Sequence, residues 1–280
     1  MGVSKISITV CDKDDFFRFS KVTCCGSVMH SHHYHNFFEI YYLTDGACNF
    51  FIDDKTYDVI VGDIVMIPKG VIHKTNYGED EHTRIVIECS ASFIPPSLCD
   101  KYTNNVYLYR NADTAKETRE LFKKIESEHL KNDDYTVECL NSLMTLLFFS
   151  IERNPNFAGA PEAKNRMIES VANYIKQNYN TDISLSAMAK NHFVSPEHLS
   201  RTFKRETGFG FNEFLTLVRL QHAENMLKEQ ETKSISEIAY NCGFNDSNYF
   251  SDKFKRVYGI SPLRFSKINR EKSIKKIEDK

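Results

Sequence analysis

The side chains best suited to contact a nucleic acid lie in two segments near the C-terminus. Arg201, in the first segment, can donate two hydrogen bonds to one guanine edge, so it is the strongest candidate for reading a base. Lys204, Lys255 and Arg256 can contact phosphates, which hold a protein on a duplex without reading its sequence. The full set of candidate DNA contacts is Glu197, Ser200, Arg201, Lys204, Ser247, Asn248, Ser251, Asp252, Lys255 and Arg256.

These residues belong to a sequence that occurs twice. Residues 184–208 are echoed by residues 234–259, and the Phe-Lys-Arg motif at 203–205 recurs at 254–256 after one inserted residue. The intervening segment 209–230 has apolar residues at helical spacing. A helix of about 19 residues spans roughly 28 Å, close to the ~34 Å between major-groove windows on one face of DNA. The repeat therefore suits two equivalent helices presented to duplex DNA.

Capping residues predict a helix-turn-helix in each copy. In the first copy, Ser195 before Pro196 gives an N-cap followed by proline at the first helical position. Gly208 can adopt the left-handed conformation that ends a helix. In the second copy, either Asn245 or Asp246 can cap the corresponding helix.

The segment from about residue 165 to residue 268 resembles the DNA-binding domain of the AraC/XylS family of bacterial transcription regulators. The motifs that carry the resemblance are Ile238-Ala239, Gly243-Phe244, Tyr249-Phe250-Ser251, Phe254-Lys255 and Gly259-Ile260-Ser261-Pro262. The resemblance implies that the second helix of each copy enters the major groove. Asp252 stands where family members often have a basic residue, and Ser266 stands where an arginine usually follows the proline motif. Because an acidic side chain repels phosphate, the second copy is expected to bind less tightly or mainly to position the protein.

The charge of the chain supports a phosphate-rich partner for its C-terminal part. The whole chain has a net charge of -2, yet residues 164–280 contain 20 Lys and Arg against 14 Asp and Glu. The eight cysteines include no Cys-x-x-Cys pair, which favours reduced thiols. No stretch approaches the ~20 apolar residues of a membrane span. We therefore expect a cytoplasmic protein without a membrane partner.

Short strands punctuated by turn residues predict a small antiparallel barrel over residues 1–110. This segment resembles the cupin barrel that forms the effector domain of many AraC-type regulators. The matching pattern is His33-x-His35-x3-Glu39-x6-Gly46, followed by Gly62-x5-Pro68-x-Gly70-x2-His73. Ser27 departs from it, since cupins have glycine at that position.

The cupin resemblance implies a site inside the barrel. In metal-binding cupins, the residues matching His33, His35, Glu39 and His73 hold a divalent ion, and this donor set suits Zn, Fe, Mn or Ni. AraC-type effector domains often keep the same positions without a metal. We expect no cofactor and no enzymatic activity; a metal-dependent cupin enzyme with a helical assembly domain is the alternative. The candidate effector contacts are His33, His35, Glu39, Tyr41 and His73.

The remaining segments complete an α+β chain. Residues 111–153 are expected to form two helices, and the broad apolar face of the second either packs on the barrel or forms a homodimer. Residues 154–164 read as a linker, 165–270 as an all-α domain with two helix-turn-helix units, and 271–280 as a charged tail. The expected function is regulation of transcription by a sugar or other small polar metabolite. The expected partners are double-stranded DNA, the effector, a second copy and, for an activator, RNA polymerase.

Overall fold

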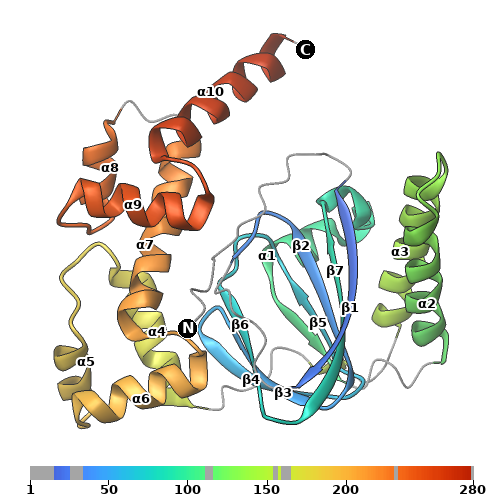
Figure 1. Ribbon diagram of the computed structural model, residues 1–280, viewed down its shortest axis with the longest axis horizontal. Helices are drawn as coiled ribbons and strands as arrows, with labels where there is room; N and C mark the ends of the chain where they lie inside the picture. Colours follow the sequence, from blue (N-terminus) through green and yellow to red (C-terminus); the bar gives the residue numbers. More distant parts are fainter. Residues whose placement is uncertain are drawn as a thin grey trace.

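The computed structural model describes residues 16–25, 34–110, 116–153, 157–158, 165–229 and 233–278, with side chains described through residue 271. The N-terminal part is built on β-sheets, and the C-terminal part beside it is helical (Figure 1). The α+β class predicted from the sequence is confirmed. No helix in the described ranges combines the length and apolar character needed to cross a membrane.

Two antiparallel sheets form the N-terminal part. The larger sheet has the strand order β1-β7-β2-β5-β8-β9, and the smaller has the order β4-β3-β6. The strands are β1 (Phe17–Cys25), β2 (Phe38–Asp45), β3 (Ala47–Ile52), β4 (Lys55–Ile60), β5 (Ile64–Ile67), β6 (His73–Tyr77), β7 (Glu81–Cys89), β8 (Tyr107–Tyr109) and β9 (Phe157–Ala158). The predicted barrel is not closed, because among the described residues no strand of one sheet pairs with a strand of the other.

The two faces of the larger sheet pack in two different cores, because successive residues of a strand point to opposite sides. On β7, Ile85 and Ile87 pack in the core beneath the covering helices, whereas Val86 packs in the core between the two sheets. Arg84 and Glu88 share the strand face of Val86. The interior of this sandwich therefore receives charged as well as apolar side chains.

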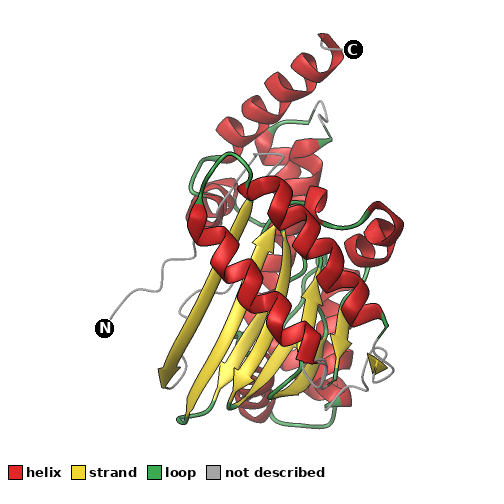
Figure 2. Ribbon diagram, turned by 90° about the vertical axis from the view of Figure 1, so that its right-hand side faces the viewer, coloured by secondary structure: helices red, strands yellow, loops and turns green. Residues whose placement is uncertain are grey.

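Two helices, α2 (Lys116–Lys131) and α3 (Thr136–Glu152), lie across the outer face of the larger sheet (Figure 2). Phe122, Met144 and Phe148 are almost completely buried beneath them. Leu147, part of the apolar stripe on the second helix, is 0% exposed and so belongs to this core. Three short helices, η1 (Ala91–Phe93), η2 (Pro96–Leu98) and α1 (Cys99–Asn104), connect β7 to β8. Within the predicted linker, the two residues of β9 pair with β8.

In the described ranges from residue 165 onward, the C-terminal part has seven helices: α4 (Arg166–Asn178), α5 (Leu185–Asn191), α6 (Pro196–Thr207), α7 (Phe211–Lys228), α8 (Ile235–Asn241), α9 (Ser247–Tyr258) and α10 (Pro262–Glu278). The Ser195 side chain caps α6 by accepting from His198 N, and Asp246 caps α9 in the same way. Gly208 and Gly259 end these helices with φ of 76° and 77°, the left-handed region expected for them. α10 continues into the segment read as a charged tail.

The two parts of the chain share a hydrophobic core. Tyr34, Phe51 and Ile72 of the sheet domain are buried in the same cluster as the core residues of the helical domain. The ring of Phe51 packs edge to face on Phe209 and Phe214, with centroids 5.9 and 5.6 Å apart. The smaller sheet therefore rests directly on the start of the segment that joins the two helix-turn-helix units.

Candidate DNA-binding and effector sites

The second helix of each unit, α6 or α9, places its candidate DNA contacts at the surface. Phe203 of α6 and Phe254 of α9 are 0% exposed and anchor the opposite face of each helix in the core. The ten candidate residues predicted from the sequence are all exposed or half-buried. Their contacts with DNA stay a prediction, but the fold leaves their side chains accessible.

The N-terminal turn of α6 holds a carboxylate one turn before Arg201. The pKa of Glu197 is lowered because its own backbone N–H and the Ser195 hydroxyl stabilise the carboxylate, with a smaller contribution from Arg201. Glu197 is therefore charged at neutral pH. A charged neighbour at this spacing can orient the guanidinium of Arg201 before it meets a base.

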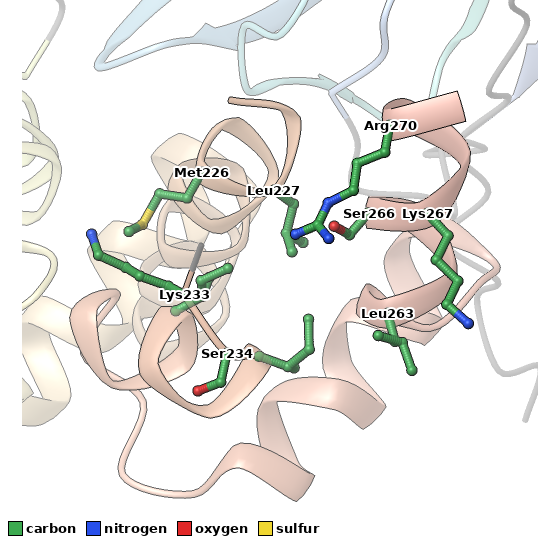
Figure 3. A pocket seen from close by; sticks show the side chains of 10 residues that line it. Met226, Leu227, Lys233, Ser234, Leu263, Ser266, Lys267 and Arg270 are labelled. Carbon is green, nitrogen blue, oxygen red and sulfur yellow. The ribbon is translucent and has the colours of Figure 1, made fainter. Parts of the chain in front are cut away.

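A small basic pocket lies between α7, α8 and α10 (Figure 3). Lys233, Lys267 and Arg270 contribute positive charge, while Leu227 and Leu263 supply apolar surface. Its volume of about 150 Å³ is smaller than that of typical small-molecule sites. We therefore assign it to the basic surface of the helical domain rather than to effector binding.

Three residues of the predicted effector site converge inside the sandwich. His35, Glu39 and His73 are at most 3% exposed, and a ligand atom of each lies within 4.8 Å of the others. Glu39 Oε2 lies 2.9 Å from His35 Nε2 and 3.6 Å from His73 Nε2. His33, the fourth residue of the predicted set, lies outside the described residues.

Hydrogen bonds fix how the two imidazoles face Glu39. His35 Nδ1 lies 3.0 Å from Phe37 O, and His73 Nδ1 lies 2.8 Å from Val71 O. A carbonyl only accepts, so each Nδ1 carries a proton and each Nε2 is turned toward Glu39. Burial opposes ionisation of Glu39, but hydrogen bonds from His35 and His73 outweigh it and place its pKa well below the usual value. Glu39 is therefore held as a carboxylate that faces two imidazoles in the interior.

An aromatic row extends from this cluster through the interior. The ring of Phe50 lies 5.9 Å from that of His73 and 5.0 Å from that of Tyr41. The Tyr41 hydroxyl then meets the Tyr77 hydroxyl at 2.9 Å. Burial raises the pKa of Tyr77 to about 12, so this hydroxyl stays protonated and available for hydrogen bonding. Tyr41 was predicted as an effector contact, and the structure places it beyond Phe50 in the same row.

The far end of the row holds a polar group that sequence reasoning missed. Tyr77 stacks on His82 with ring centroids 3.6 Å apart, and Arg84 lies 5.1 Å from the Tyr77 ring. Arg84 Nη1 also lies 3.2 Å from His82 Nε2 and 3.7 Å from Cys24 Sγ. The sequence does contain a signal for it: Ile85 and Ile87 lie on one face of the strand, so His82 and Arg84 lie on the other, which faces the interior.

Two parts of the chain match known protein families. Residues 26–143 match the family described as AraC-like ligand binding domain. Residues 188–268 match the family described as helix-turn-helix domain. The ligand-binding match thus includes strands β2 to β8, α2 and part of α3.

Relatives match over most of the chain. The HTH-type transcriptional activator RhaS of Mannheimia succiniciproducens is 29% identical over 248 residues, covering 82% of this chain and 87% of its own. The activator RhaR of the same organism is 24% identical and covers 83% of this chain and 86% of its own. These matches place the chain among regulators rather than enzymes, which excludes the cupin-enzyme alternative.

Two solved structures are also similar. ToxT from Vibrio cholerae O395 is 18% identical, with a TM-score of 0.38, and covers 90% of this chain and 97% of its own. The C-terminal domain of the response regulator AraT from Geobacillus stearothermophilus is 31% identical, with a TM-score of 0.36, and covers 37% of this chain and 86% of its own. From the two domain matches and the RhaS and RhaR relatives, the chain belongs to the AraC/XylS family of transcription regulators, with an N-terminal ligand-binding domain and a C-terminal helix-turn-helix DNA-binding domain.

Proposed function

We propose that this protein activates transcription in response to a small polar molecule bound inside the N-terminal sandwich. RhaS and RhaR, which match over most of both chains, are named as transcriptional activators. The observation that carries the proposal is the position of one segment, residues 68–73, which consists of the loop after β5 and the first residue of β6. This segment, loop 68–73, contributes to the candidate effector site and also contacts the helical domain.

The loop joins β5 to β6 and contacts both sides. On the effector side, Gly70 N donates to His35 O at 2.7 Å, and His73 lies beside Glu39. On the other side, Gln221 of α7 donates from Nε2 to Gly70 O, and Ile72 is buried in the core shared with the helical domain. A ligand that repositions either imidazole therefore moves a loop that contacts α7.

Strand β6 gives a second connection, to the helix expected to read DNA. Lys74 Nζ donates to Gly208 O at 2.6 Å, and Asn76 Nδ2 donates to Arg205 O at 3.2 Å. These carbonyls lie at the C-terminal end of α6, where a lysine also suits the negative end of the helix dipole. Since His73 begins β6, a shift of the strand would be transmitted to α6.

In this account, α6 and α9 enter successive major grooves of the operator. Arg201 reads a base, and Lys204, Lys255 and Arg256 contact or flank phosphates. We also propose contact with RNA polymerase, which an activator must recruit, and a cytoplasmic location, where the operator lies.

The test is a mobility-shift assay with the full-length protein and DNA from upstream of its own gene. We expect a shift that survives excess random DNA and changes with one compound from a panel of sugars and sugar acids. A shift that random DNA abolishes would contradict specific recognition. A specific shift that no compound changes would contradict effector control.

We propose that the effector site works without a resident cofactor, with a divalent ion as the alternative. Two inward-facing Nε2 atoms and one carboxylate fit such an ion, and the backbone carbonyls behind each ring would hold the imidazoles in orientation. A bound ion would balance the negative charge of the Glu39 carboxylate. Elemental analysis of protein purified without chelators or a histidine tag decides between the two.

We propose a homodimer formed by the exposed apolar residues of α2 and α3. Leu130 is 77% exposed and Leu146 is 54% exposed. Replacing both with Glu should give a folded monomer by light scattering, because a charge in an apolar interface is costly. The matched change Leu147→Glu should instead lower the melting temperature sharply, since that side chain is in the core. A Leu130→Glu, Leu146→Glu protein that stays dimeric would rule out this interface.

A further inference from the structure

The least expected group in the sandwich interior is Arg84. Arg84 is 9% exposed, and its side chain lies on the face of β7 that points between the two sheets. Within the described part of the chain, Nη1 contacts His82 and Cys24, and the guanidinium lies over the Tyr77 ring. No described carboxylate forms an ion pair with it. Glu88, two residues along the same strand, pairs instead with Arg18.

A buried guanidinium without a carboxylate partner is energetically costly. Arginine stays protonated in proteins, so the charge cannot be removed by titration. Burial lowers the pKa of His82, and Arg84 adds to that effect, so the imidazole is neutral at physiological pH and offers no negative charge. Buried charges are normally paired, and an unpaired one in a ligand-binding domain indicates that the partner arrives with the ligand.

The surroundings of Arg84 suit the acidic end of a small molecule. Arg84 hydrogen-bonds to described residues through Nη1, and a guanidinium has five N–H donors in a planar fork that matches an oxyanion. Cys24, beside it on edge strand β1, is only partly buried, so the group lies close to solvent at that edge. The hydroxyls of Tyr41 and Tyr77 lie next along the row.

The opposite end of the row has complementary chemistry. Glu39 lies four residues from Leu43, the cross-strand partner of Arg84, which corresponds to about 13 Å along the strand. Between them lie the rings of Phe50 and Tyr41. A molecule of that length could place an acid at Arg84, its body along the rings, and hydroxyl groups at Glu39 and His73.

We infer that the effector is a small organic acid whose carboxylate or phosphate pairs with Arg84 while its polar far end binds Glu39 and His73. This rests on the proposed effector function and narrows it, because a neutral sugar would leave the guanidinium unpaired. Arg84 selects ligands that carry an acid group. The cluster of His35, Glu39 and His73, beside loop 68–73, responds to the bound ligand.

Thermal unfolding of the full-length protein tests the inference at constant ionic strength. The probes are galacturonate, succinate and inorganic phosphate, with galactose as the neutral match to galacturonate. At about 10 mM, we expect at least one acid to raise the melting temperature by about 3 °C or more, and galactose to have no effect. Comparing the carboxylates with phosphate shows which oxyanion is preferred.

The decisive variant is Arg84→Met, with Lys21→Met as its charge-matched control on the exposed face of β1. Arg84→Met should melt no lower than the wild type without ligand, because it loses an unpaired charge, and its rise with acid should disappear. Lys21→Met should keep the rise. If Arg84→Met does not fold, Arg84→Lys should fold and show a reduced rise, because it keeps the charge without the planar fork.

Several outcomes would overturn the inference. An acid that stabilises Arg84→Met as much as the wild type would show that Arg84 does not bind it. If galactose raised the melting temperature of both the wild type and Arg84→Met, the proposed effector site would stand but the acidic ligand would be refuted. No rise with any acid would refute the inference too, and the mobility shift would then show separately whether DNA recognition stands.

Discussion

A protein in which Glu39 and His73 are both replaced by Ala is expected to lose its response to the effector and keep its affinity for the operator. These two buried side chains supply the hydrogen bonds at one end of the proposed ligand. Losing hydrogen bonds to charged groups should cost about 3 kcal/mol, or about 100-fold in effector affinity. Calorimetry with the effector and a reporter gene measure the two effects.

Replacing both residues together avoids leaving one partner charged and unpaired in the interior. A matched pair of changes on the helical side of the loop, Lys74→Ala with Gln221→Ala, separates binding from transmission. That protein should bind the effector normally but respond weakly, because it loses the contacts to Gly208 and Gly70. A full reporter response from the Glu39→Ala, His73→Ala protein would place the effector elsewhere.

Arg201→Ala is expected to weaken binding to the operator by about 1 to 3 kcal/mol, or about 5- to 150-fold, and to relax the preference at one base pair. Arg201 is exposed on α6, and arginine is the side chain most often used to read guanine. Binding curves on the operator and on single-base variants measure the effect.

Lys255→Ala is the comparison, because a phosphate contact should weaken binding to every sequence and flatten the dependence on salt. Lys255 is exposed on α9 at the position that repeats Lys204. An equal loss on operator and random DNA for Arg201→Ala would show that this residue contacts only phosphate.

The helical domain was predictable because its signals are local. Ser195, Asp246, Gly208 and Gly259 cap or end helices through contacts within a few residues of themselves, so the sequence pattern specifies them directly. The strands were harder to predict. β6 carries His73, Lys74 and Asn76, which read as polar loop residues until the pairing with β3 is known.

The candidate effector site was only partly predictable. His35, Glu39 and His73 follow from a resemblance, and the structure brings these three together. Tyr41, predicted as an aromatic neighbour, is separated from His73 by the ring of Phe50. Arg84 did not follow, because a charged residue in a strand reads as solvent-facing unless both faces of the sheet are covered. Here α2 and α3 cover one face and the smaller sheet covers the other.

Long-range packing could not be read from the sequence. No local signal marks Phe51 of β3 or Ile72 of the loop after β5, yet both join the core of the helical domain. Leu147 has the spacing of a dimer face but is buried beneath the sheet domain. Both outcomes depend on which surfaces meet in three dimensions.

The most direct test of the whole account is reciprocal linkage in the full-length protein. Operator affinity is measured with and without saturating effector, and effector affinity is measured with and without saturating operator. If the two sites are coupled through the loop and β6, both ratios should equal the same factor, typically 5- to 150-fold for such coupling. An effector that binds tightly in the N-terminal domain while both ratios equal one would contradict the account.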